Sequence, residues 1–306
     1  MAEPALRSRA ATRCGFIALL GAPNAGKSTL INRLVGTKVS IVSPKVQTTR
    51  NRVLGIAMFD QAQAVFLDTP GIFAPKARLQ RAMVHAAWSG ARDADLIVVL
   101  IDAGRSLCAD ARRIIDGLRA RDARAVAALN KIDAVKRPDL LTLASAVDSE
   151  DVFSEIFMIS ALTGDGVTAF AEALSARLPM GPWLYPADQA ADMPVRLLAA
   201  EITREKLFLQ LHQELPYAAA IETESWRERN DGSVRIDQIV YVRRPTQKMI
   251  VLGKGGSKIK AIGAAARQEL EHLLDRRVHL FLHVKVREGW PDDPARYRDL
   301  GLDFNV

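Results

Sequence analysis

Cysteine is scarce in this chain of 306 residues, and long apolar runs are missing. Cys14 and Cys108 are the only cysteines, which excludes a disulfide framework and favours a reducing compartment. The five histidines show no zinc-ligand spacing with them. No segment approaches the roughly 20 apolar residues of a membrane-spanning helix, and 96–101 is only long enough for a strand. We therefore expect neither a transmembrane segment nor a zinc site.

The bulk composition is that of a soluble globular protein. Charged residues make up 25% and hydrophobic residues 49%, and the length allows one large domain or two medium ones. Residues 1–13 are basic but lack a long apolar core, so they do not form a secretory signal. We expect a disordered tail there, with a transit peptide as the alternative. The net charge of +7 indicates an anionic partner.

The first half alternates short apolar runs with longer amphipathic segments. This pattern predicts a mostly parallel sheet with helices on both faces, as in an α/β phosphate-loop domain. Only residues 60–63 separate the second and third predicted strands, so these two should form an antiparallel hairpin. The predicted strands are 15–20, 52–59, 64–68, 96–102, 125–130 and 153–160, and the predicted helices are 27–35, 79–93, 109–121, 138–147 and 167–178.

The second half has a different pattern. Four prolines between 179 and 194 predict a linker, because proline cannot donate a backbone hydrogen bond to a helix or sheet. The remaining residues predict a smaller α+β module, with helices at 202–214 and 258–274 and strands at 217–227, 234–243 and 278–287. Asn-Asp-Gly at 230–232 predicts a hairpin turn. We therefore divide the chain into domains at 14–178 and 195–306, joined by the linker 179–194.

A phosphate-loop pattern, G-x-x-x-x-G-K-S, lies between the first predicted strand and helix. Its backbone N–H groups would surround the phosphates of a nucleotide, and the N-terminus of the helix would add positive potential. Lys27 would reach the β- and γ-phosphates, and Ser28 would bind Mg²⁺. The residues predicted to bind the nucleotide here are Gly21, Ala22, Pro23, Asn24, Ala25, Gly26, Lys27 and Ser28.

Asp68, Thr69, Pro70 and Gly71 follow the third predicted strand. In phosphate-loop nucleoside triphosphatases a carboxylate at this place holds Mg²⁺ through a water molecule, and the Gly71 N–H would face the γ-phosphate. Ile72 comes next, where Ras-like GTPases place a glutamine that orients the attacking water. An apolar side chain cannot orient water, so we expect slow intrinsic hydrolysis unless another group assists.

The loop 43–50 contains Thr48 and Thr49. A threonine here can offer its hydroxyl to Mg²⁺ and its N–H to the γ-phosphate, and loss of that phosphate would release the loop. Both residues fit, and we favour Thr49. Lys27, Thr49 and Gly71 are thus the predicted catalytic residues.

Asn130, Lys131, Ile132 and Asp133 end the fifth predicted strand. The Asp133 carboxylate can accept hydrogen bonds from N1–H and the 2-amino group of guanine. Adenine lacks these donors and would leave the carboxylate unpaired, which can discriminate by factors on the order of 10⁴. Asn130 would brace the phosphate loop, and the Lys131 stem would cover the base. A backbone N–H after the sixth strand could donate to guanine O6, from the segment Ser160, Ala161 and Leu162.

A second glycine loop, G-x-x-G, lies at 253–256 in a basic stretch that no acidic residue interrupts. The loop lets a nucleic-acid backbone approach closely, and an apolar groove formed by Ile250, Leu252 and Ile259 would hold unstacked bases. This predicts an RNA-binding KH module of type II. The residues predicted to bind RNA are Arg244, Lys248, Gly253, Lys254, Gly255, Gly256, Lys258, Ile259 and Lys260.

Together the motifs resemble the Era family of bacterial ribosome-assembly GTPases, from about residue 14 to the C-terminus. The segments 204–206 (R-E-K) and 214–217 (E-L-P-Y) discriminate best, because many GTPases share 21–28, 47–50, 68–71 and 130–133. The resemblance implies hydrolysis of GTP to GDP with Mg²⁺. Asn24 is similar to the asparagine that holds K⁺ in potassium-dependent GTPases. Gly255 replaces a lysine that is frequent in the family loop, and Lys254 would take over its phosphate contact.

The resemblance also implies the partners of the chain. These are the 3′ end of small-subunit (16S) ribosomal RNA and the 30S precursor during late maturation. It implies a cytoplasmic protein with a peripheral inner-membrane pool, and we expect a monomer. Two alternatives stay open: a GTP-binding RNA chaperone with negligible hydrolysis, which Ile72 allows, and a nucleotide-dependent kinase or ATPase, against which Asp133 argues.

Overall fold

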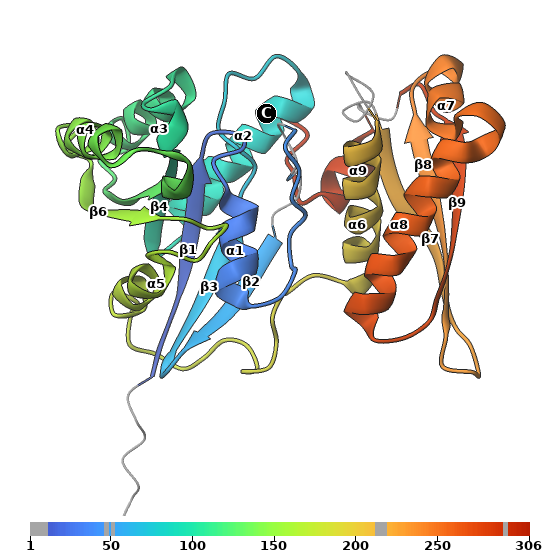
Figure 1. Cartoon of the computed structure of the whole chain (residues 1–306), viewed down its shortest axis with the longest axis horizontal. Coiled ribbons are helices and arrows are strands. Elements are labelled where there is room, and N and C mark those ends of the chain that lie inside the picture. The colour runs from blue at the N-terminus through green and yellow to red at the C-terminus, as the bar shows by residue number, and fades with distance from the viewer. Residues whose placement is uncertain (1–11, 46–48, 50–52, 212–218, 290–292) are drawn as a thin grey trace, which may run out of the picture. The chain divides into compact units, whose positions relative to one another are not determined.

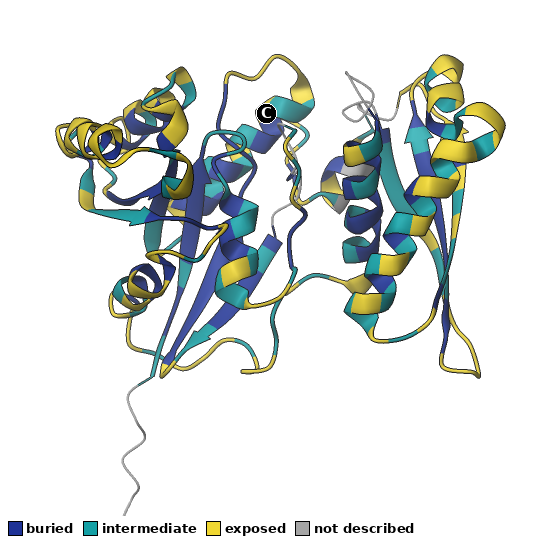
Figure 2. Ribbon diagram, in the orientation of Figure 1, coloured by how far each residue is buried: buried dark blue, intermediate teal, exposed yellow. Residues whose placement is uncertain are grey.

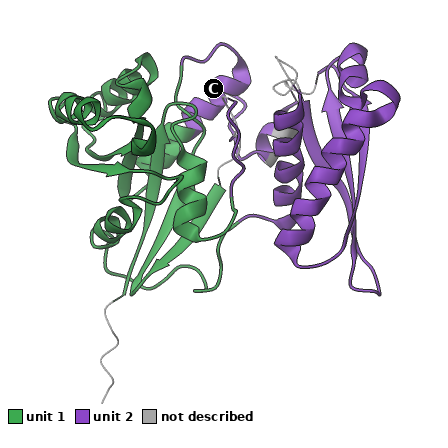
Figure 3. Ribbon diagram, in the orientation of Figure 1, with its two compact units in different colours: residues 1–39, 53–73, 87–192 green, residues 40–52, 74–86, 193–306 purple. Residues whose placement is uncertain are grey.

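The computed structural model describes residues 12–45, 49, 53–211, 219–289 and 293–306, which form two compact units (Figure 3). Unit 1 comprises 1–39, 53–73 and 87–192, and unit 2 comprises 40–52, 74–86 and 193–306. Segments 40–52 and 74–86 therefore belong to unit 2, although both fall inside the range predicted for the first domain. Most of the predicted N-terminal tail lies outside the described residues, but Arg13 already begins the first strand.

Unit 1 contains a six-stranded sheet of order β2-β3-β1-β4-β5-β6 (Figure 1). All neighbouring strands are parallel except β2 and β3, which form the predicted antiparallel hairpin. The mostly parallel sheet is thus confirmed. Its strands are β1 (Arg13–Gly21), β2 (Val53–Phe59), β3 (Ala62–Asp68), β4 (Leu96–Asp102), β5 (Ala125–Asn130) and β6 (Phe153–Ile159).

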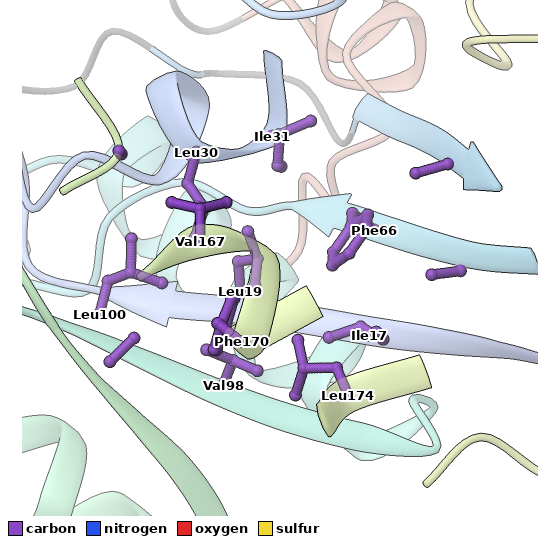
Figure 4. Packing of buried hydrophobic residues seen from close by; sticks show 14 of the residues in the cluster. Ile17, Leu19, Leu30, Ile31, Phe66, Val98, Leu100, Val167, Phe170 and Leu174 are labelled. Atoms are coloured by element: carbon purple, nitrogen blue, oxygen red, sulfur yellow. The ribbon is translucent and has the colours of Figure 1, made fainter. Parts of the chain in front are cut away.

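Side chains along the central strands point alternately to the two faces of this sheet and form a core on each face. In β1, Ile17 and Leu19 face α1 (Lys27–Val35) and α5 (Val167–Ser175), where they pack with Leu30 and Phe170 (Figure 4). Successive strand residues point to opposite faces, so Ala18 and Leu20 contribute to the other core. There they pack with α2 (Arg78–Arg92), α3 (Ala109–Arg119) and α4 (Arg137–Asp148).

Burial on both faces explains why the central strands read as continuous apolar runs, and Figure 2 shows them buried along most of their length. Each fully buried side chain of this size contributes about 1.5–3 kcal/mol relative to an exposed one. The consequence for function is positional. The parallel strands β1, β3, β4, β5 and β6 end at one edge of the sheet, and every predicted nucleotide motif of unit 1 follows the end of a strand there.

Unit 2 contains a three-stranded sheet of order β7-β8-β9. Strands β7 (Ala219–Glu228) and β8 (Val234–Val242) are antiparallel, whereas β9 (Val278–Val286) pairs with β8 in parallel. Helices α6 (Val195–Gln210) and α8 (Ser257–Leu274) bury apolar residues against the strands, in two clusters that include Phe208 with Val240 and Ile202 with Ile236. Helix α7 (Pro245–Leu252) precedes α8, and α9 (Pro294–Asp299) follows β9. The predicted α+β module is confirmed.

The helical segments of unit 2 that were not predicted include α9, the start of α6 and the whole of α7. Helix α6 begins at Val195, seven residues before the predicted start, because Pro194 is its N-cap rather than part of an irregular linker. Helix α7 was missed altogether. Its proline stands in the first turn, where no backbone donor is needed, and the Gln247 side chain accepts the N–H groups of Arg243 and Arg244 at 2.9 and 3.1 Å.

Across the described ranges, no helix is long and apolar enough to cross a membrane.

Candidate functional site

The phosphate loop connects β1 to α1 and is shaped by left-handed backbone. Asn24 has φ 65° and Gly26 has φ 102°. A Cβ atom at Gly26 would lie 2.2 Å from Asn130 Nδ2, so only glycine fits where the loop passes this side chain. The loop therefore ends at the N-terminus of α1, where unsatisfied N–H groups favour an anion.

Lys27 is buried beneath this loop, with 6% of its surface exposed. Its Nζ donates to the carbonyl oxygens of Gly21 at 3.2 Å and Ala22 at 3.3 Å. Burial lowers the pKa of Lys27 to about 8, although the nearby Asp68 carboxylate opposes this shift. The ammonium group is thus held among backbone oxygens, at the place where a phosphate would offer a stronger partner.

Ser28 and Asp68 meet beside the loop. Asp68 ends β3, the neighbour of β1, and its Oδ2 accepts the Ser28 Oγ hydroxyl at 2.8 Å. Both oxygens are hard ligands of the kind that Mg²⁺ prefers. A magnesium ion that also binds nucleotide phosphates fits this pair, because the protein needs to supply only one or two ligands to it. The next residue, Thr69, is held by its Oγ1 hydroxyl, which donates to Leu19 O at 2.7 Å.

Gly71 and Ile72 lie against the phosphate loop. The Ile72 N–H donates to Gly21 O at 3.1 Å, and a Cβ atom at Gly71 would lie 2.9 Å from the Pro23 nitrogen. The Ile72 side chain is fully buried in the core of unit 1. It therefore points into apolar surroundings and cannot act on a water molecule at the phosphates.

Asn130 joins two of the predicted motifs to each other. It ends β5, is 1% exposed, and donates from Nδ2 to Ala25 O at 2.8 Å. Its Oδ1 accepts the Ala161 N–H at 2.9 Å. One amide thus connects the phosphate loop to the segment after β6, and both ends of its side chain are satisfied.

Lys131 and Asp133 follow directly. Lys131 has φ 70° and its Nζ pairs with Asp102 Oδ2 at 2.6 Å. Asp102 ends β4 and belonged to no motif, so sequence reasoning missed it. Asp133 is exposed, and no described residue donates a hydrogen bond to its carboxylate. The turn after β5 therefore presents one paired cation and one available carboxylate.

Thr49 is 8% exposed, and Thr48 lies outside the described residues. The choice of Thr49 stays a prediction.

The G-x-x-G loop joins α7 to α8. Gly253, Gly255 and Gly256 have φ values of 72°, 58° and 78°, and no heavy atom would lie within 4 Å of a Cβ at Gly255 or Gly256. Backbone in this conformation, with open space beside it, allows another chain to approach. The loop is thus left-handed at three of its four residues.

The side chains around this loop are basic and mostly exposed. The predicted side chains at Arg244, Lys254, Lys258 and Lys260 are exposed, and Lys248 is half-buried. In the described part of the chain, no carboxylate pairs with any of these lysines. Of the three predicted groove residues, Ile250 is exposed, whereas Leu252 and Ile259 lean on the core of unit 2.

Unit 2 also contains a polar network that includes the segment 40–45. The Val42 N–H donates to Glu205 Oε1 at 2.8 Å, and Glu205 Oε2 pairs with Lys206 Nζ at 2.9 Å. Lys206 also pairs with Glu269 of α8. Burial alone would lower the pKa of Lys206, but its hydrogen bonds to Glu269 and Glu205 raise it above the usual value. Lys45 Nζ donates to the carbonyls of Phe208 and Leu211 at the end of α6.

Each residue of the R-E-K segment thus has contacts of its own. Glu205 and Lys206 link the segment 40–45 to α8, as described above. Arg204 is 3% exposed, donates from Nε to Glu201 Oε1 at 2.8 Å, and lies over the Phe208 ring at 5.2 Å.

The segment 74–86 packs inside unit 2 against the C-terminal residues. Ala82 and Met83 of α2 form a buried cluster with Tyr297 and Leu302. Tyr297 meets Phe304 edge-on at 4.9 Å, and the Arg78 guanidinium lies 4.6 Å from the centre of the Phe304 ring. Both segments of unit 2 that precede residue 193 are therefore held by specific contacts.

Two family models match the chain. Residues 16–131 match a family described as 50S ribosome-binding GTPase, and residues 214–291 match the KH domain. These matches agree with the predicted fold class, a phosphate-loop domain followed by a KH domain.

Curated relatives match nearly the full length. The chain is 62% identical to GTPase Era of Sinorhizobium medicae, over 96% of this chain and 94% of that protein. It is 61% identical to GTPase Era of Rhizobium meliloti, with the same two coverages. The GTPase Era of Agrobacterium fabrum is 60% identical over 96% of this chain and 92% of its own length.

Two solved structures are similar throughout. One is a single-residue variant of Aquifex aeolicus Era bound to GDP·AlF₄⁻, and the other is Era in complex with MgGDPNP and nucleotides 1506–1542 of 16S ribosomal RNA. Each has a TM-score of 0.90 and 37% sequence identity, and each match covers 96% of this chain and 100% of the other.

Proposed function

The chain belongs to the Era family of GTPases, and from this premise we propose that it is a GTP-hydrolysing switch that binds small-subunit ribosomal RNA and assists maturation of the 30S subunit. One observation carries the proposal. A phosphate loop, a Ser28–Asp68 pair and an Asn130 bridge converge at one sheet edge of unit 1, in a chain whose second unit carries an uncompensated basic G-x-x-G loop.

For the phosphates, we assign the cradle to the backbone N–H groups of 21–28 and to Lys27. Bound Mg²⁺ would neutralise charge on the β- and γ-phosphates, held by Ser28 directly and by Asp68 through water. We assign to Thr49 a hydroxyl ligand for Mg²⁺, and to the Gly71 N–H a hydrogen bond to the γ-phosphate. Lys27 stabilises the charge that develops on the phosphates during attack by water, which is where a fixed cation contributes most.

For the base, we assign guanine selectivity to Asp133. Its available carboxylate accepts hydrogen bonds from N1–H and the 2-amino group of guanine. Asn130 connects the phosphate loop to the segment 160–162 after β6. Lys131 covers the ring while Asp102 holds its ammonium group at 2.6 Å. The segment 160–162 supplies a backbone donor for O6.

For the rate, the buried Ile72 side chain cannot orient water in the way that the glutamine of Ras-like GTPases does. We assign to Asn24, which has φ 65° in the loop, a part in holding K⁺ beside the phosphates. We therefore expect slow hydrolysis that K⁺ accelerates. A GTP-binding RNA chaperone without appreciable hydrolysis is the second candidate, because the same burial of Ile72 favours it.

For RNA, we assign the G-x-x-G loop and Lys254, Lys258 and Lys260. A related Era structure holds nucleotides 1506–1542 of 16S ribosomal RNA, and we propose the 3′ end of the same RNA as the ligand here. The exposed lysines meet phosphates, and the exposed Ile250 lies beside unstacked bases.

For coupling, we propose that segments 40–52 and 74–86 report the nucleotide state to unit 2. Each is continuous with a nucleotide motif, since the first contains Thr49 and the second begins three residues after Gly71. Within unit 2 they are held by Glu205 and by the C-terminal cluster around Tyr297. A change at the γ-phosphate would therefore act on contacts with α6 and with the C-terminal cluster.

Single-turnover phosphate release from GTP tests the proposed activity, measured in K⁺ and in Na⁺ at equal ionic strength. Slow release that is faster in K⁺ supports the switch. Saturable GTP binding with no release in either salt would leave the chaperone as the function. Phosphate release at equal rates in both salts would contradict the proposed roles of K⁺ and Asn24.

For location, we propose a cytoplasmic monomer with a peripheral inner-membrane pool. This part rests on the family alone, and cell fractionation with and without a high-salt wash tests it.

A further inference from the structure

Within the segment 160–162 after β6, one backbone amide is available to a ligand. The N–H groups of Ser160, Ala161 and Thr163 already donate, to Asp165 O at 2.9 Å, Asn130 Oδ1 at 2.9 Å and Ser160 Oγ at 3.0 Å respectively. No residue that the structure describes accepts the Leu162 N–H, and Leu162 is 69% exposed. The donor assigned above to guanine O6 is therefore the Leu162 amide.

Arg33, in the last turn of α1, holds the opposite side of this amide. Its Nε donates to the Ala161 carbonyl at 2.7 Å, and its Nη2 donates to the Leu162 carbonyl. The Ala161 carbonyl and the Leu162 N–H belong to one planar trans peptide group and point in opposite directions. A guanidinium fixed on the carbonyl side therefore sets the direction of the N–H on the other side.

The loop backbone is fitted closely around the guanidinium. Gly164 has φ 96°, and a Cβ atom there would lie 2.8 Å from Arg33 Nη1. A planar guanidinium presents several donors in a rigid fork, which suits two neighbouring carbonyls, whereas an ammonium group is a single flexible point. The contact therefore restrains the two peptide groups on either side of Leu162.

We propose that Arg33 is a positioning residue for guanine recognition, which aims the Leu162 N–H at O6 of the base. The inference rests on the proposed guanine nucleotide function and names a residue outside all of its motifs. Arg33 itself need not contact the base. Its effect should depend on whether the ligand carries an acceptor at position 6.

The test is a cycle between protein variants and ligand atoms. Dissociation constants are measured by calorimetry, with Mg²⁺, for GDP and for 2-aminopurine riboside 5′-diphosphate, which lacks O6. The analogue also lacks N1–H, but that loss is the same for every variant and cancels from the comparison. The proteins are wild type, Arg33→Met, Arg33→Lys and the control Arg113→Met, which removes an exposed arginine whose side chain pairs with Asp110 at 2.9 Å in α3.

We expect Arg33→Met to raise the Kd for GDP about tenfold, equivalent to about 1.4 kcal/mol. The same substitution should change the Kd of the analogue less than about twofold, since the aimed amide has no partner there. Arg33→Lys should restore part of the GDP affinity, and Arg113→Met should affect neither ligand. Unfolding midpoints confirm that each variant is folded at the temperature of the titration.

Equal losses for both ligands in Arg33→Met would overturn the inference, because a general distortion of the loop does not depend on O6. Unchanged GDP affinity in that variant would also overturn it. A wild-type protein that binds GDP no better than the analogue would instead remove the guanine site of the proposed function, and the inference with it.

Discussion

Substitution of Glu205 by alanine should uncouple RNA binding from the nucleotide. The Glu205 carboxylate is 3% exposed and accepts the Val42 N–H at 2.8 Å. A hydrogen bond to a charged group contributes about 1.5–3 kcal/mol to stability. If this bond holds segment 40–45 in only one nucleotide state, it can change RNA affinity by at most that amount, or about 10- to 100-fold.

The assay is fluorescence anisotropy with a single-stranded RNA of the small-subunit 3′ end, with GDP or a non-hydrolysable GTP analogue. For the wild type we expect tighter binding with the analogue, and for Glu205→Ala a ratio of the two affinities close to one. Glu205→Gln should be intermediate, because its amide oxygen still accepts the Val42 N–H. Glu201→Gln is the control, since Glu201 pairs with Arg204 and not with segment 40–45. A folded Glu205→Ala protein that keeps the wild-type ratio would refute the reasoning.

Three further predictions concern the base, the RNA and the phosphates. Asp133→Asn should weaken GTP binding and favour xanthosine triphosphate, as measured by competition between the two nucleotides. Unchanged selectivity in this variant would contradict the assigned base contact. Replacing Lys254 and Lys258 together by Asp should lower RNA affinity by roughly 10²–10³-fold and reduce its salt dependence. The control is Lys136→Asp, which changes an exposed lysine of unit 1. Wild-type RNA affinity in the double variant would contradict the assigned KH site. GDP affinity should fall as pH rises past 8, because a Lys27 whose pKa is lowered to about 8 becomes neutral and can no longer pair with phosphate. Calorimetric titrations between pH 7 and 8.8 that give a constant Kd would contradict this assignment.

Much of the nucleotide edge was predictable because it depends on local pattern. A buried strand that ends in Asp68 or Asn130 places its polar residue at the edge of the sheet, whatever the rest of the chain does. The apolar runs predicted the strands, and parallel pairing of these strands predicted that their carboxyl ends lie at one edge of the sheet. The same reasoning located the G-x-x-G loop before α8.

Contacts between distant residues could not be read from pattern. Glu205 and Val42 are separated by 163 positions, Arg33 and Ala161 by 128, and Lys131 and Asp102 by 29. No local pattern in the sequence links the two partners of any of these pairs. These partners became visible only when the fold brought them together.

The missed helix α7 has a different cause. It has only eight residues, Val251 is its only residue classed as buried, and it begins at a proline. Its apolar face is therefore too short to show a helical period, and proline in the sequence indicates a break as often as a helix start.

Calorimetric titration of the purified chain with GDP and with ADP, in the presence of Mg²⁺, is the most direct test of the central claim that backbone amides, Lys27 and Asp133 together bind a guanine nucleotide. We predict saturable one-to-one binding of GDP and no detectable binding of ADP at the same concentrations. Absence of saturable GDP binding, or equal affinity for the two nucleotides, would contradict the account.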